Sequence, residues 1–249
     1  MSDKKLEIIV PYRDRAEDLA EFVPNVSKFL NHHGIRNYRI TVVNQLLNAQ
    51  FNRGKLLNVG FLESRNDSDY SVFHDVDVYP VIYDGKPVRG YELIEADGIK
   101  VEWHGVPNYH YHDGAWSILN PGKRSAGTIC KIDNISYGAV NGHSNSFWGW
   151  GYEDNDLFYR LDRYLKENKK PRFLKQGKRP SPYHSAHFKD IRRNTGFVGC
   201  PEHIVNEAIG AKMWADKEYN FKHDGLSSCN YRVDSVENYD HYRILNVYL

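Results

Sequence analysis

Residues 6-LEIIV-10, 40-ITVV-43 and 70-YSVF-73 decide the fold of this 249-residue chain. Each is a short apolar run typical of a buried strand. Between the first two runs, apolar residues recur every three or four positions over 19–30, which predicts a helix, and 52–65 reads as a second helix. Strands that alternate with helices across short connections predict an α/β fold with a mostly parallel central sheet flanked by helices.

Polar residues follow the first and third of these strands. Ligands of parallel sheets bind at the carboxyl ends of strands, and these ends carry 11-PYRDR-15 and 74-HDVD-77. Asp75 and Asp77 leave the sheet on a bend where both are able to face one cation, and oxygen ligands suit Mg²⁺, Mn²⁺ or Ca²⁺. Taken alone, such a triplet is more often a solvated turn, so the interpretation depends on its surroundings.

The stretch 147-FWGWGYEDND-156 is the most informative in the chain. Glycine lets the backbone approach a ligand closely, and a tryptophan face accepts a sugar ring. The acidic residues that follow are suited to bind hydroxyl groups, and one of them to remove a proton. They equally suit the first turn of a helix, where carboxylates are favourable, and the two interpretations are compatible.

His184 and His187 form a second candidate group. On one helical turn this spacing places both imidazoles on the same side. By itself the pair is either two surface histidines or two metal ligands. Joined to Asp77, it gives one carboxylate and two imidazoles, a donor set that favours Mn²⁺ over Mg²⁺.

Four motifs, in order and spacing, resemble the β-1,4-galactosyltransferases, and most of all their xylosylprotein branch. They are 11-PYRDR-15, 51-FNRGKLLNVGF-61, Asp75-Val76-Asp77 and 148-WGWGYED-154. The resemblance covers nearly the whole chain except residues 81–120. It implies a single-domain A-type nucleotide-sugar glycosyltransferase fold, and an inverting enzyme that uses Mn²⁺ and a UDP-sugar such as UDP-galactose to form a β linkage.

The resemblance also implies roles for individual residues. Asp154 is expected to be the catalytic base, and Asp77, His184 and His187 are expected to ligate the metal. The residues expected to contact the UDP-sugar are Pro11, Tyr12, Arg13, Arg15, Phe51, Asn52, Arg53, Val76, Asp77 and Trp150. Those expected to contact the acceptor are Trp150, Tyr152, Glu153, Asp154 and Asn155.

Two departures from the family pattern bear on specificity. Asn155 stands where the family usually has a third acidic residue, which weakens binding of acceptor hydroxyls and spares the base. Ser125 occupies the position of a tyrosine that in the family restricts the donor to unsubstituted galactose. A small side chain there leaves room for an N-acetyl group, so UDP-N-acetylgalactosamine is expected as a second donor. The acceptor is expected to be a glycan or glycoconjugate of unspecified identity.

Two other functions remain open on sequence grounds. A sugar-binding protein of the same fold without turnover is disfavoured by the intact Asp77 and Asp154. A hydrolase that activates water on a bound metal needs only His184, His187 and Asp77. It leaves the tryptophan-glycine segment 148–151 unexplained.

Charge and composition exclude several classes. Lysine and arginine number 33 against 32 acidic residues, a net charge of +1 that gives no electrostatic basis for a nucleic-acid partner. Three cysteines without paired spacing indicate neither a disulfide framework nor a thiolate metal site. No transmembrane segment or signal peptide is recognised, so a complete chain is expected to be cytoplasmic. As part of a longer anchored protein, it is expected in the Golgi lumen instead.

The organisation expected is one catalytic domain over 1–249. A nucleotide-binding half occupies about 1–80 and an acceptor and metal half about 121–249. Between them, residues 81–121 are irregular and are expected to leave the sheet. Residues 183–215, a range that includes both histidines of the pair, are expected to form a long functional loop.

Overall fold

The computed structural model describes the strands of the central sheet, the helices that pack on it, and several short strands elsewhere. No helix in this part of the chain is long and apolar enough to cross a membrane. The described residues are 4–32, 34–47, 49–80, 82–83, 86–87, 93–96, 99–102, 117–118, 126–127, 129–168, 188–190, 199–215 and 221–249.

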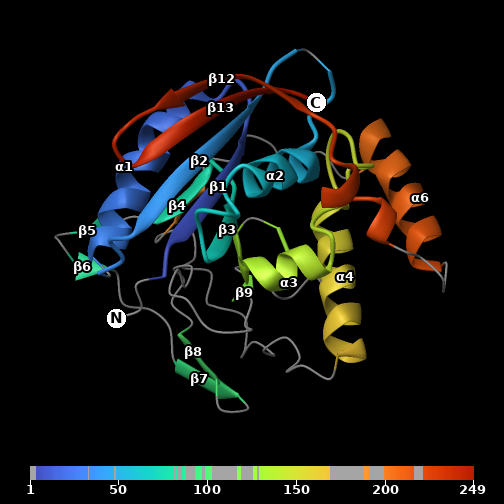
Figure 1. The fold of residues 1–249 in the computed structure, drawn as a ribbon, viewed down its shortest axis with the longest axis horizontal. Coiled ribbons are helices and arrows are strands. Elements are labelled where there is room, and N and C mark those ends of the chain that lie inside the picture. Colours follow the sequence, from blue (N-terminus) through green and yellow to red (C-terminus); the bar gives the residue numbers. More distant parts are fainter. Residues whose placement is uncertain are drawn as a thin grey trace.

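A seven-stranded sheet forms the centre of the fold (Figure 1). Its four middle strands run parallel, in the order β13-β2-β1-β3, and both edges are antiparallel. The predicted α/β class and parallel centre are confirmed, and the edge strands make the whole sheet mixed. The strands, in sheet order, are β12 (Arg232–Asn238), β13 (Tyr242–Tyr248), β2 (Tyr38–Gln45), β1 (Leu6–Tyr12), β3 (Tyr70–His74), β10 (Ile129–Asp133) and β9 (Ser117–Ile118).

Helices cover both faces of the sheet because side chains alternate along each strand. Leu6, Ile8 and Val10 pack with α1 (Ala16–His32), which lies on the left in Figure 1. Ile9, between them, points to the opposite face and packs with α2 (Arg53–Leu62). Also on this second face are α3 (Asn134–Ala139) and α4 (Glu153–Glu167).

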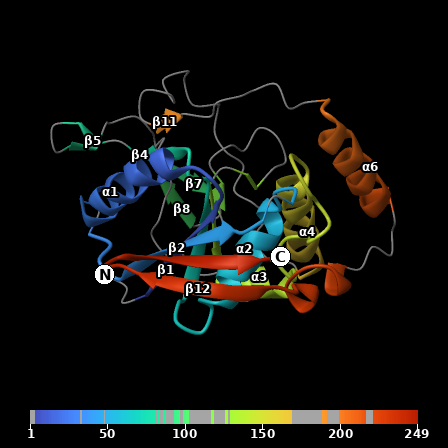
Figure 2. The ribbon, with the colours of Figure 1, turned by 90° about the horizontal axis from the view of Figure 1, so that it is seen from above.

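Most of the described part of the irregular region after β3 leaves the main sheet, as predicted, but β9 at 117–118 returns to it and pairs with β10. The other described residues form two small antiparallel hairpins and one strand that pairs with a distant segment. Figure 2 shows β11 beside β4, although more than 100 residues separate them in the chain. The elements are β5 (Ile82–Tyr83) with β6 (Lys86–Pro87), β7 (Leu93–Ala96) with β8 (Ile99–Glu102), and β4 (Val78–Pro80) with β11 (Phe188–Asp190).

The C-terminal third contains a helix where a loop is predicted. Residues Pro201–Ala215 form α6, so the prediction of a loop over 183–215 is wrong for this part. A proline at the first helical position favours helix initiation, and this signal is present in the sequence. Two short 3₁₀ helices, η2 (Phe221–His223) and η3 (Leu226–Ser228), then lead into β12.

The close approach of α2 to the sheet depends on Gly60. A Cβ atom at this position would overlap the Ile9 Cγ2 methyl and lie 3.0 Å from Val43 Cγ2. Both neighbours are β-branched and buried, so their side-chain rotamers are restricted and have little room to move away.

Replacing Gly60 with alanine should therefore destabilise the protein by about 1–3 kcal/mol through overpacking. Urea unfolding measures this change. Gly138→Ala is the matched control, because a Cβ there meets nothing within 4 Å, and removing a helical glycine should be neutral or stabilising by about 0.5–1 kcal/mol. Equal unfolding free energies for the two variants would contradict this account of the helix–sheet contact.

Candidate active site

The carboxyl ends of β1 and β3 bring the segments 11–15 and 74–77 together, as predicted. These strands are parallel neighbours. Arg15, just beyond β1, places its Nη1 atom 2.9 Å from Oδ2 of Asp77, which follows β3. The same nitrogen lies 3.4 Å from Oδ2 of Asp18 in α1. The predicted donor-site arginine and the predicted metal-ligating carboxylate therefore share one edge of the sheet.

Arg53 joins this edge to the start of α4. Its Nε atom lies 2.7 Å from Oδ1 of Asp75, and its Nη1 atom lies 3.4 Å from Oε1 of Glu153. Burial alone would lower the pKa of Arg53, but Asp75, Glu153 and Asp154 together raise it above its ordinary value. The guanidinium is therefore a permanent positive charge between the Asp75–Asp77 triplet and the acidic helix start.

Glu153 and Asp154 occupy the first turn of α4, which confirms the helix-start interpretation of these acidic residues. Burial, with a contribution from the neighbouring Asp154 charge, raises the pKa of Glu153 from 4.5 to about 7. Asp154 is less buried than Glu153, and its Oδ1 atom accepts a hydrogen bond from the Asn155 backbone N–H at 2.8 Å. Of the two carboxylates, Asp154 is thus the one presented toward solvent.

Asn52 and Val76, both predicted to contact the donor, are buried. Asn52 caps α2: its Oδ1 atom accepts from the Lys55 backbone N–H at 2.8 Å, and its Nδ2 atom donates to the Asn145 carbonyl at 2.9 Å. The Val76 side chain lies in the core cluster with α1. Their side chains support the site from beneath and do not form its surface.

Arg13 and Phe51, also predicted to contact the donor, lie together. The Arg13 guanidinium lies over the Phe51 ring at 5.3 Å, and its Nη1 atom donates to the Ala49 carbonyl at 2.6 Å. Pro11 is buried, and Tyr12 is partly buried against the α1 core. An aromatic ring beside a fixed cation, at the end of β1, suits a nucleoside base and its phosphates.

Trp150 lies on a turn of unusual backbone conformation. Gly149, Gly151 and Tyr152 have φ values of 78°, 97° and 77°. The Gly149 N–H donates to the Phe51 carbonyl at 2.7 Å, which ties this turn to the segment that precedes α2. Trp150 is 41% exposed, and an exposed indole suits contact with a sugar ring.

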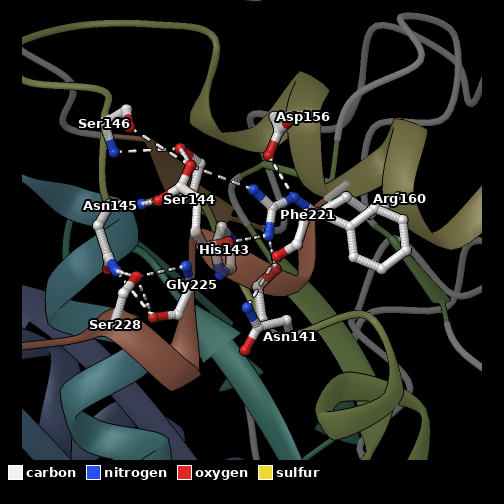
Figure 3. A network of polar contacts seen from close by, with 12 residues as sticks. Asn141, His143, Ser144, Asn145, Ser146, Asp156, Arg160, Phe221, Gly225 and Ser228 are labelled. Atoms are coloured by element: carbon white, nitrogen blue, oxygen red, sulfur yellow. Dashed lines mark hydrogen bonds and ion pairs between the residues drawn. The ribbon is translucent and has the colours of Figure 1, made fainter. Parts of the chain in front are cut away.

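A buried network around Arg160 holds α4 in place (Figure 3). The Arg160 guanidinium contacts Asp156 Oδ2 at 2.6 Å, the Gly142 carbonyl at 3.2 Å and the Asp224 carbonyl at 2.7 Å. Asp224 in turn accepts hydrogen bonds from the Asn145 backbone and from the Ser144 hydroxyl. One arginine thus ties two separate segments, at Gly142 and at Asp224, to α4.

Sequence reasoning missed this network. The only available signal was the spacing of four between Asp156 and Arg160, which is common on solvated helix surfaces. Neither the burial of the pair nor the role of Asp224, some 64 residues away, follows from that spacing.

The predicted metal site is described only in part. Asp77 lies at the sheet edge, whereas His184 and His187 lie outside the described residues, as does Ser125. Within the described part of the chain, no three histidine, cysteine or acidic side chains are grouped to hold a metal ion. One carboxylate with two imidazoles fits Mn²⁺ by its chemistry.

The chain segments that follow Asp77 and residue 187 are hydrogen-bonded neighbours. β4 starts directly after Asp77 and pairs with β11, which starts at Phe188. The register sets Val78 opposite Asp190, so Asp77 and Phe188 lie at opposite ends of this ribbon.

Comparison with known proteins places this architecture in a class. The N-terminal region of glycosyl transferase group 7 matches residues 1–84, and the N-terminal domain of galactosyltransferase matches residues 109–185. The structure is similar to the catalytic domain of Drosophila beta1,4galactosyltransferase 7 in complex with xylobiose. The TM-score is 0.68 at 26% identity, covering 99% of this chain and 94% of that one.

Sequence relatives agree with the structural likeness. Mouse beta-1,4-galactosyltransferase 7 is 33% identical over 93% of this chain, and the human protein of that name is 39% identical over 63%. The xylosylprotein 4-beta-galactosyltransferase of Caenorhabditis elegans is 38% identical over 63%. This chain spans 62%, 43% and 50% of the lengths of these three relatives, respectively.

The fold is that of the A-type nucleotide-sugar glycosyltransferases, with acidic and basic side chains gathered at the carboxyl ends of parallel strands. Within that class, the two matched regions together cover more than half of the residues. The chain belongs to the β-1,4-galactosyltransferase family.

The raised pKa of Glu153 makes stability depend on pH. The folded state holds this proton up to about pH 7, whereas the ordinary value is 4.5. Between these values the folded state binds more protons than the unfolded state, so the free energy of unfolding falls as pH rises. Glu153→Gln mimics the protonated form and should remove up to about 3 kcal/mol of this fall between pH 5 and pH 8.

Urea unfolding of the ligand-free protein at both pH values measures the difference. Glu167→Gln, at the exposed end of the same helix, is the control and should keep the pH dependence of the wild type. If the Glu153 variant loses stability with pH as steeply as the wild type, the assignment of a raised pKa to Glu153 is wrong.

Proposed function

We propose that this chain is the catalytic domain of an inverting glycosyltransferase. It transfers galactose from UDP-galactose to a hydroxyl group of a sugar acceptor, with formation of a β linkage. Residues 1–80 contribute most of the nucleotide site, and residues 121–249 contribute the acceptor and metal half. Family membership and the complex of the Drosophila relative with manganese, UDP-Gal and xylobiose support this proposal.

The observation that carries the proposal is the bridge made by Arg53. It connects Asp75, at the edge predicted to bind the donor, with Glu153, next to the predicted base. A transferase needs both substrates in one place, because displacement at a sugar carbon requires the attacking oxygen close to that carbon. The bridge brings the donor edge and the acceptor carboxylates within the span of one side chain.

The chemistry assigned to the residues follows from this arrangement. As the acceptor oxygen bonds to the anomeric carbon, its proton passes to the Asp154 carboxylate, and the bond from that carbon to the UDP oxygen breaks. Attack from the side opposite UDP inverts the anomeric configuration. Trp150 offers its exposed face to the sugars, and Tyr152, Glu153 and Asn155 complete the acceptor side.

Mn²⁺ is the proposed cofactor, held by Asp77, His184 and His187. When bound, the ion neutralises negative charge on the two phosphates of UDP. Arg15, whose guanidinium already pairs with Asp77, adds positive charge at the same edge.

A UDP-release assay tests this function. The wild type should release UDP from UDP-galactose only with Mn²⁺ and a suitable sugar acceptor, found by screening free sugars and glycosides. Asp154→Asn should reduce the rate on the order of 10² to 10⁴-fold, the usual contribution of a positioned base, while calorimetry still detects UDP and Mn²⁺ binding. Release without acceptor identifies a hydrolase, and binding without release identifies a sugar-binding protein. Normal turnover by the variant would transfer the base role to Glu153 or Asp156.

We further propose that UDP-N-acetylgalactosamine is a second donor. The support is the small side chain of Ser125 at the position that a tyrosine occupies in the family. An open pocket does not strongly reject the smaller galactose, so kcat/KM for the two donors should differ by less than about 200-fold. Ser125→Tyr should suppress N-acetylgalactosamine transfer and keep galactose transfer. Strict rejection of the N-acetylated donor by the wild type would contradict the assignment of Ser125.

A further inference from the structure

One side chain of α6 donates hydrogen bonds to the backbone of the turn that carries Trp150. Asn206 Nδ2 lies 3.0 Å from the Trp148 carbonyl, 3.2 Å from the Trp150 carbonyl and 3.1 Å from the Gly151 carbonyl. All three partners are acceptors, so the amide nitrogen must face them. Asn206 is only 1% exposed, which keeps water from replacing these contacts.

The three carbonyls share a structural property. Each belongs to the peptide unit just before a residue of positive φ: Gly149, Gly151 or Tyr152. The φ angle of a residue sets the orientation of the peptide unit before it. The positive φ values of Gly149, Gly151 and Tyr152 therefore orient the three carbonyls toward Asn206. For Tyr152, which is not glycine, this backbone conformation is costly and persists only when its surroundings enforce it.

Other residues of α6 pack closely against the same turn. A Cβ atom on Gly149 would lie 2.6 Å from Cγ of Glu202, so only glycine fits beneath this helix. The His203 ring lies 5.1 Å from the Trp150 ring. A Cβ atom on Gly210 would lie 3.0 Å from Cδ1 of Tyr152, so the absence of a side chain at Gly210 lets Tyr152 pack against the helix. The helix is therefore closely packed over the turn, and Asn206 supplies the polar contact at its centre.

We propose that Asn206 is a positioning residue, which holds the turn of residues 148–152 so that Trp150 and the first turn of α4 face the acceptor. It touches neither substrate and acts through the backbone of the turn. Its effect on acceptor binding rests on the proposed transferase function. Its effect on the exposure of Trp150 does not.

The test replaces Asn206 with leucine, which has a similar volume and no donor. Loss of the hydrogen bonds to these three carbonyls should raise the acceptor KM about tenfold or more, with the KM for UDP-galactose unchanged. Acrylamide quenching of tryptophan fluorescence supplies a second readout. Subtracting the quenching of the Trp150→Phe protein from that of the protein with Trp150 gives the signal of Trp150 alone. The accessibility of Trp150 to acrylamide should be greater in the Asn206→Leu background than in the wild-type background.

Val205→Ala is the matched control, because this neighbouring side chain is 58% exposed, and it should behave as the wild type in both assays. Asn206→Ser keeps one donor and provides an intermediate effect if the leucine variant does not fold. Unchanged acceptor KM and quenching in a folded variant would overturn the proposal, as would equal rises in the KM of donor and acceptor. If the wild type transfers no sugar, the proposed function fails, and the quenching comparison still decides the role of Asn206.

Discussion

A guanidinium group that is shielded from water at the start of α2 imposes a geometric requirement on the site. Arg53 keeps its charge, and an unpaired buried charge typically costs 3–5 kcal/mol, so its two carboxylate partners must stay in place. One partner, Asp75, lies at the end of β3, and the other, Glu153, begins α4. The end of β3 and the start of α4 are therefore held close together by the Arg53 side chain, which is itself part of the scaffold.

Local patterns in the sequence predicted the parts of this scaffold that depend on neighbouring residues. The strands at 6–10, 40–43 and 70–73 are recognisable because each is a short apolar run, and all three lie in the parallel centre of the sheet. The meeting of Arg15 with Asp77 followed from the rule that parallel strands end at one edge. The acidic start of α4 followed from the preference of carboxylates for a helix N-terminus.

Long-range partnerships were beyond such patterns. Arg160 is an ordinary polar residue in the sequence, and its burial results from contacts with segments 18 and 64 residues away. Asn52 and Val76 lie in motifs that resemble donor-binding segments, but the structure uses their side chains for a helix cap and for the core. A loop was predicted over 183–215, whereas Gly210 lies within α6 and is a point of close contact with Tyr152.

The position of β13 has a consequence for how the protein is made. This strand consists of residues 242–248, yet it lies inside the sheet, parallel to β2, and its Leu245 and Val247 side chains are fully buried. Hydrogen bonds from Asn44 to Asn246 and from Arg243 to Thr41 span about 200 residues of chain. The sheet can therefore close only after residues 242–248 have been synthesised, about 200 residues after β2, and until then β2 exposes an unpaired edge. Contacts this distant in sequence slow folding and prolong exposure of such an edge, which favours aggregation of the unfinished chain.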